Sequence, residues 1–327
     1  MVTERIGLAS AWFCIIMKYI SSFRRAMGKD DRTGGKKMQY TIENQELKLT
    51  VDTRGAEMVE LICKATGEQM LWTADEAWNR HAPMLFPHTG RLKDHTYTVD
   101  GKQYTSKQHG FIRDMEHAVV AQTADSITFE TAANDFSRER FPFEFIFRTT
   151  YTLIGNTVRH AVEVMNNGDK EMRFGFGYHP GFLCPFDDKH TTQDYELRFD
   201  IPQTPVEQKT PGGLCGETHV YMENSDVIQL TDELFQSDSI CLTQLTAKTL
   251  SLVEKESGRK VEVSIEGFPY VLVWSASTPK LQFVCIEPWH SLPDRVDASG
   301  KWEDKPCAAA LKAGESWSTH LDMTFVR

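Results

Sequence analysis

The sequence lacks the short motifs that mark common cofactor and hydrolase sites. It contains no GxGxxG segment after a strand, no Walker A loop, no GxSxG turn and no HExxH pair. These spacings place phosphates, a nucleophilic serine or a zinc ion, so a nucleotide cofactor, a serine hydrolase and a zinc protease are unsupported. We expect a protein that needs no cofactor and no metal.

Positive charge is also scarce. The 327 residues carry 36 Lys and Arg against 46 Asp and Glu, a formal net charge of -10. Nucleic acids and anionic membranes require clustered Lys and Arg, which disfavours both as partners. The seven cysteines are widely spaced and include no CxxC pair, which indicates a reducing compartment. We therefore expect a cytoplasmic protein whose partner is an uncharged or weakly charged small molecule. The sequence carries no signal of its oligomeric state.

No apolar run is long enough to cross a membrane. The longest near the N-terminus, Ile6–Met17, has 12 residues, whereas a membrane helix needs about 20. Basic residues follow it, and then a charged, glycine-containing segment at 29–37. We predict that residues 1–37 are a flexible extension and that residues 38–327 form one domain.

From Met38 onward the hydrophobic period is two rather than 3.6, which is typical of strands. Apolar and aromatic residues alternate from Phe143 to Leu153, Gly155-Asn156 predicts a tight turn, and alternation resumes at Val158. Asp100-Gly101 and Ser257-Gly258 mark further hairpins.

Strands joined by tight turns pair antiparallel, so the sequence predicts an all-β fold, one large antiparallel β-sandwich. Helical periodicity is sparse, and we expect only short helices, at residues 75–80 and 231–235.

Two segments carry candidate acid–base residues. Glu287 ends an apolar strand before Pro288, where it either emerges into solvent or points inward. An inward carboxylate would have a raised pKa suited to general-base work. His179 lies among aromatics and glycines, where it is either a core histidine bonded to backbone or a group for acid catalysis near neutral pH.

Further polar residues lie in two nearby segments. Arg91 follows a glycine turn and offers forked donors to vicinal oxygens, although a surface ion pair is its commoner role. His109 precedes another glycine. His81, His88 and His95 recur every seven residues, but this spacing places successive residues on opposite faces of a strand, so we do not expect a metal site.

Taken together, these segments resemble the aldose 1-epimerase (galactose mutarotase-like) family, in particular its LacX-like bacterial branch. The resemblance extends over nearly all of residues 38–327. It rests on FPHTGRLKD at 86–94, QHGFIRD at 108–114, NNGDKEMRFGFGYHPGF at 166–182, GFPYVLVWS at 267–275 and CIEPW at 285–289.

The resemblance implies a β-supersandwich, which has a sugar site in a groove on one sheet. By similarity, His179 matches the general acid and Glu287 the general base. Arg91 and His109 match groups that hold ring and hydroxyl oxygens, and Asp238 matches an aspartate that binds sugar hydroxyls. The implied activity is interconversion of α and β anomers of free aldohexoses.

Two alternatives stay open at this level. A hexose-6-phosphate mutarotase would need a basic cluster, for which Arg91, Lys93 and Arg113 are candidates. A carbohydrate-binding module or sensor would keep the fold without catalysis. A glycoside hydrolase is disfavoured, because it normally uses two carboxylates flanking the bond and Glu287 has no evident companion.

Overall fold

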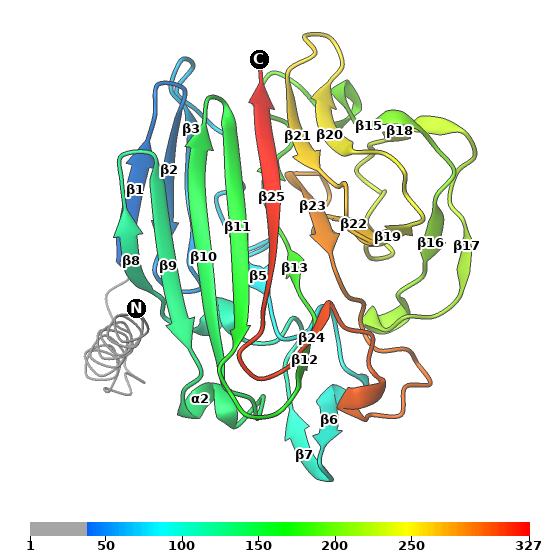
Figure 1. Cartoon of the computed structure of the whole chain (residues 1–327). Coiled ribbons are helices and arrows are strands. Elements are labelled where there is room, and N and C mark those ends of the chain that lie inside the picture. Colours follow the sequence, from blue (N-terminus) through cyan, green and yellow to red (C-terminus); the bar gives the residue numbers. More distant parts are fainter. Residues whose placement is uncertain (1–37) are drawn as a thin grey trace, which may run out of the picture. The chain divides into compact units, whose positions relative to one another are not determined.

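The computed structural model describes residues 38–327, so the predicted extension at 1–37 lies outside the described residues. Two large sheets pack face to face in the described chain, and smaller sheets adjoin them (Figure 1). Every strand ladder in this part is antiparallel, which confirms the predicted all-β sandwich.

The larger sheet has nine strands, and its central ladder is formed by the longest ones (Figure 1). In spatial order the strands are β18 (Ser225–Gln229), β15 (Tyr195–Gln203), β20 (Thr249–Glu254), β21 (Lys260–Ser264), β25 (Ser316–Val326), β11 (Thr157–Asn166), β10 (Phe145–Ile154), β9 (Ser126–Ala132) and β8 (Ala118–Gln122).

The second sheet has eight strands and carries the candidate catalytic residues. Its order is β17 (Thr218–Val220), β16 (Val206–Gln208), β19 (Ile240–Thr243), β22 (Tyr270–Trp274), β23 (Phe283–Trp289), β13 (Gly177–Tyr178) and β5 (Met84–Leu85), and β14 (Gly181–Leu183) also pairs with β23.

Three small sheets and a few short helices complete the described chain. The small sheets are β1 (Gln39–Glu43) to β4 (Glu68–Gln69) through β2 (Leu47–Asp52) and β3 (Glu57–Cys63), β12 (Met172–Phe174) with β24 (Ala309–Leu311), and β6 (Thr96–Val99) with β7 (Lys102–Thr105). The helices are α2 (Asp135–Arg138) and the 3-10 turns η1 (Lys93–His95), η2 (Ile112–Asp114), η3 (Thr192–Asp194), η4 (Pro211–Gly213) and η5 (Trp302–Asp304). None of these helices is long and apolar enough to cross a membrane.

The predicted hairpins are present. Alternate residues of β10 are buried, and Ile154 pairs with Thr157 across the two-residue turn Gly155-Asn156. Val99 pairs with Lys102 across Asp100-Gly101 in the same way. The period-two pattern therefore located both strands and turns, because a strand with one buried face must alternate.

The predicted short helices at 75–80 and 231–235 are wrong, since both segments are irregular or turn structure. In the first, the Asp75 carboxylate accepts the Ala77 N–H at 2.6 Å, and the Asp75 N–H donates to the Trp78 carbonyl at 3.2 Å. Local side-chain bonds of this kind offer the backbone an alternative to helix.

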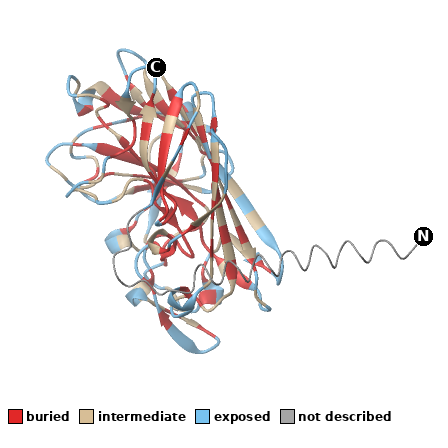
Figure 2. Cartoon of the chain, turned by 90° about the vertical axis from the view of Figure 1, so that its left-hand side faces the viewer, coloured by how far each residue is buried: buried red, intermediate tan, exposed pale blue. Residues whose placement is uncertain are grey.

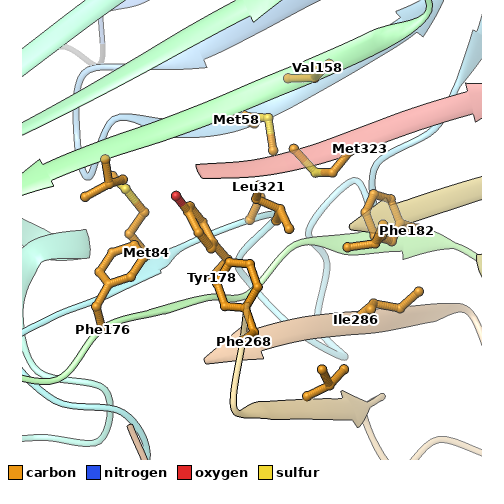
Figure 3. Packing of buried hydrophobic residues seen from close by; sticks show 14 of the residues in the cluster. Met58, Met84, Val158, Phe176, Tyr178, Phe182, Phe268, Ile286, Leu321 and Met323 are labelled. Atoms are coloured by element: carbon orange, nitrogen blue, oxygen red, sulfur yellow. The ribbon is translucent and has the colours of Figure 1, made fainter. Parts of the chain in front are cut away.

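Buried residues concentrate between the two layers (Figure 2), and most of them are apolar. Tyr178 of β13 reaches from one sheet to the other, where its hydroxyl donates to the His160 carbonyl of β11 at 2.9 Å. Figure 3 shows Tyr178 among Phe176, Phe268 and Leu321 in this layer. The sheet that carries the site is therefore held by packing and by a buried hydrogen bond.

We predict that Phe86→Ala lowers the free energy of unfolding by about 3–5 kcal/mol, the usual cost of truncating a buried aromatic. Phe86 is fully buried, and its ring lies 5.1 Å from that of Phe145 and 5.3 Å from that of Phe147. Urea titration measures the change. Val220→Ala, at a site 50% exposed, is the control and should change stability by less than about 0.5 kcal/mol. Equal effects of the two substitutions would contradict the assignment of Phe86 to the core.

Candidate active site

Strand register places His179 opposite Glu287. Gly177 of β13 pairs with Trp289, and Gly181 of β14 pairs with Cys285. His179 lies midway between the two glycines, and Glu287 lies midway between their partners on β23. Because directly opposed residues project to the same face of a sheet, the two side chains meet.

The two candidate catalytic groups are close and buried. His179 Nε2 and Glu287 Oε2 are 3.2 Å apart, and the side chains are 7% and 2% exposed. The contact lacks hydrogen-bond geometry, and both Glu287 Oε2 and His179 Nδ1 have no hydrogen-bond partner. The Glu287 carboxylate therefore points inward, toward the His179 ring.

Burial dominates the electrostatics of both groups. It raises the pKa of Glu287 well above its usual range, and the charge of Asp238 adds to this effect. It lowers the pKa of His179 to about 3, with a further contribution from the positive charge of Arg113. Perturbations of this kind are typical of functional sites, since a low-dielectric environment disfavours charged forms.

An aromatic stack holds the His179 ring. Trp78 lies parallel to the imidazole with ring centroids 4.9 Å apart and an interplanar angle of 24°. Phe283 covers Trp78 at 5.4 Å and 18°. Trp274 meets the His179 ring edge-on at 5.7 Å. These contacts fix the plane of the imidazole and exclude water from that side.

Glycine at position 181 makes the close approach of Trp78 possible. A Cβ at Gly181 would lie 2.8 Å from Trp78 Cζ3, closer than real side chains allow. Gly177 gives similar access to Trp289, where a Cβ would lie 2.5 Å from the indole. The two glycines near His179 therefore allow aromatic rings to approach the backbone, and neither has a left-handed backbone conformation.

His109 completes a cluster of imidazole and indole rings. Its ring lies 5.5 Å from that of His179 and 5.6 Å from that of Trp289. His109 Nδ1 accepts the Gly90 N–H at 3.0 Å, which leaves the proton of the neutral ring on Nε2. Burial lowers the pKa of His109 well below its usual value, so the ring is a neutral donor.

The remaining predicted residues are exposed. Arg91 donates to the Gly212 carbonyl at 3.2 Å, and its charge is one of those that lower the pKa of buried His109. Asp238 has a left-handed backbone (φ 119°), and its carboxylate accepts the Ser239 N–H at 2.7 Å. Its effect on the pKa of Glu287 places Asp238 within electrostatic reach of that carboxylate.

Two groups in the described chain have the composition of a metal site, and neither includes the heptad-spaced histidines. One is Asp187, His190 and Glu254. The other is His179, Cys285 and Glu287, whose ligand-type atoms lie within 4.8 Å of one another. Of the heptad histidines, His88 is buried and its Nε2 is 2.7 Å from Ser106 Oγ, a structural contact.

Comparison with known proteins identifies the fold and its family. The family model described as aldose 1-epimerase matches residues 38–324. The chain belongs to the aldose 1-epimerase family. It is 30% identical over 300 residues to the chromosomal LacX protein of Lactococcus lactis subsp. lactis, covering 88% of this chain and 100% of that one. The predicted family and LacX-like branch are thus confirmed.

Solved structures agree with this placement in the aldose 1-epimerase family. A galactose mutarotase related enzyme from Lactobacillus acidophilus has a TM-score of 0.85 at 35% identity, over 89% of this chain and 98% of that one. A galactose mutarotase-like protein from Lactobacillus casei has a TM-score of 0.81 at 28% identity, over 88% and 100%.

Sequence reasoning did not find Trp78, Trp274 or the proximity of Cys285. Trp78 lies in a segment expected to be helical, and only the folded chain brings it to His179. Cys285 was visible in the CIEPW segment. Its two-residue spacing from Glu287 was the available signal, because it places both side chains on one face of a strand.

We predict that Gly181→Ala displaces Trp78 from the His179 ring and lowers the free energy of unfolding by about 1–3 kcal/mol, a typical cost of overpacking. Calorimetry and near-ultraviolet circular dichroism measure these changes. Adding Trp78→Phe removes the clashing atom Cζ3 and should recover part of the stability lost. A Gly181→Ala protein as stable as wild type would contradict the contact.

Proposed function

We propose that the protein is an aldose 1-epimerase that interconverts the α and β anomers of free aldohexoses, with His179 and Glu287 as its acid–base pair. The observation that carries this proposal is the buried approach of His179 Nε2 to Glu287 Oε2 at 3.2 Å. Membership of the aldose 1-epimerase family supports the same activity.

The chemistry requires two coordinated proton transfers. Burial favours a protonated Glu287 beside a neutral His179, and transfer of that one proton from Glu287 to His179 gives the reactive carboxylate and imidazolium. Glu287 then takes the proton of the C1 hydroxyl while His179 protonates the ring oxygen, so the C1–ring oxygen bond breaks and a free aldehyde forms. Rotation about C1–C2 presents the other carbonyl face. Ring closure then returns both protons with the roles reversed, and no oxidation or reduction occurs. A base and an acid suffice for this, and each contributes about 10²–10⁴ in rate when positioned.

We assign the holding of the sugar to three further polar groups, His109, Arg91 and Asp238. The neutral His109 ring presents its Nε2–H beside the acid–base pair. Arg91 and Asp238 are exposed and within electrostatic range of His109 and Glu287, respectively, as a sugar-binding rim requires. Burial of His179 and Glu287 strengthens their interaction with hydroxyl groups, because the local dielectric constant is low.

A phosphorylated sugar is less well supported. Arg91, Lys93 and Arg113 each donate to a backbone carbonyl, and Arg91 also donates to the side-chain oxygen of Gln108, so these donors are engaged within the protein. The acceptors are Gly212 for Arg91, Ala298 for Lys93 and Gln108 for Arg113. A phosphate site would need several such donors directed at one point.

The cysteines support a location in a reducing compartment, and we propose the cytoplasm. All six in the described chain are free thiols, and only Cys307 is not buried. Secreted domains of this kind commonly carry disulfides instead.

We predict that Glu287→Gln slows mutarotation by about 10²–10⁴-fold, because the amide cannot accept the C1 hydroxyl proton. Polarimetry on freshly dissolved α-glucose and α-galactose measures the rate. The exposed Glu256→Gln is the matched control and should keep wild-type activity. Equal, slow rates for wild type and Glu287→Gln, with sugar bound by both, would instead identify a binding module.

We further predict that free aldohexoses are converted faster than their 6-phosphates, because the basic side chains of Arg91, Lys93 and Arg113 already donate to oxygen atoms of the protein. A panel of anomerically pure sugars and phosphosugars, compared by kcat/KM, measures the preference. A preference for the phosphates would select the hexose-phosphate alternative.

A further inference from the structure

Cys285 lies beside the acid–base pair and has no part in the proposed reaction. Its Sγ, a carboxylate oxygen of Glu287 and a ring nitrogen of His179 all lie within 4.8 Å of one another. All three residues are buried, at 0%, 2% and 6% exposure. The sequence therefore brings a thiol, a carboxyl and an imidazole to one point.

The fold explains this convergence. Cys285 and Glu287 are two residues apart on β23, so both project to the same face, while Val284 and Ile286 pack into the core between the sheets. Cys285 pairs with Gly181, which has no side chain to cover the sulfur. A Cβ at that position would itself approach Sγ to 3.4 Å.

The site has unsatisfied polar atoms. Glu287 Oε2 has no hydrogen-bond partner although its side chain is only 2% exposed, and it points at His179 Nε2. A buried carboxylate oxygen without a donor is costly, and a cation is one group that would satisfy it.

The second cluster of similar composition is already filled. Between Asp187 and Glu254 lies the Arg259 guanidinium, whose Nη2 is 2.7 Å from Asp187 Oδ2 and 2.5 Å from Glu254 Oε2. An ion there would have to displace this partly buried arginine. The cluster at Glu287 has no such internal cation in contact with its carboxylate in the described chain.

We propose that His179, Cys285 and Glu287 form a binding site for one divalent cation of the Zn²⁺ class, and that this ion inhibits the protein. Nitrogen, sulfur and oxygen ligands favour Zn²⁺ or Co²⁺ over Mg²⁺ or Ca²⁺, which prefer oxygen alone. A thiolate and a carboxylate together neutralise the charge of the ion. The thiol proton of Cys285 and the carboxyl proton of Glu287 leave to solvent on binding, and water takes the fourth position.

Contraction of the site by small side-chain movements accommodates the ion. Zinc binds sulfur at about 2.3 Å and nitrogen or oxygen at about 2.0–2.2 Å. The ion then occupies the space between the acid and the base and holds the lone pairs that proton transfer needs. Binding does not rest on the proposed mutarotase function, whereas the inhibition does.

Direct titration with Co²⁺ tests the binding. We expect one Co²⁺ per chain with a thiolate-to-cobalt charge-transfer band, displaced by Zn²⁺. Cys285→Ser should abolish this band, and Cys307→Ser, which removes the most accessible described thiol, should retain it. Should Cys285→Ser fail to fold by circular dichroism, Cys285→Ala replaces it. No band in wild type, or a band that survives loss of Cys285, would overturn the site.

Inhibition is tested separately by polarimetry of the wild-type protein. Zn²⁺ should stop mutarotation, and EDTA should restore it. Cys285→Ser should need about tenfold or more Zn²⁺ for the same inhibition, since even outer-shell partners of metal ligands change affinity by about 10–100-fold. If the wild-type protein shows the cobalt band but the metal-free protein shows no mutarotation, the proposed function is refuted and the proposed metal site stands. Mutarotation unaffected by saturating Zn²⁺ refutes the inhibition.

Discussion

A carboxylate held inside a β-sandwich, opposite an imidazole, is the constraint on which the site depends. Glu287 is 2% exposed and stands 3.2 Å from His179 Nε2. Isolated burial of a carboxylate costs several kcal/mol or drives it to the neutral form. The strong upward shift of its pKa reflects this cost. The sandwich must therefore be stable enough to keep an unfavourable pair in place.

The framework meets this demand by placing Glu287 within β23 and His179 in the two-residue segment between β13 and β14. β23 is buried along its whole length, and Tyr178, next to His179 in sequence, anchors β13 to the opposite sheet. The stack of His179, Trp78 and Phe283 then fixes the imidazole plane. Of the groups that would hold hydroxyls, Arg91 and Asp238 are exposed side chains between strands, whereas His109 is buried beside the pair.

The close packing of His179, Cys285 and Glu287 underlies both the proposed reaction and the proposed metal site. A site that brings an acid and a base close together also brings their lone pairs together, and Cys285 adds a soft ligand. Neutral sugar hydroxyls and a divalent cation are alternative ways to satisfy the unpartnered oxygen of Glu287. The proposed cation would therefore compete with substrate for the same groups.

The sequence by itself determined the all-β class, the hairpins at Gly155-Asn156 and Asp100-Gly101, and the family, because period two and tight turns are local properties. It also singled out His179 and Glu287. Only the tertiary structure decided that Glu287 points inward and that Trp78 leaves a helical pattern to cover His179. Strand register joins residues more than one hundred positions apart, and no local pattern specifies it. Burial and the pKa shifts that follow exist only once those strands are paired.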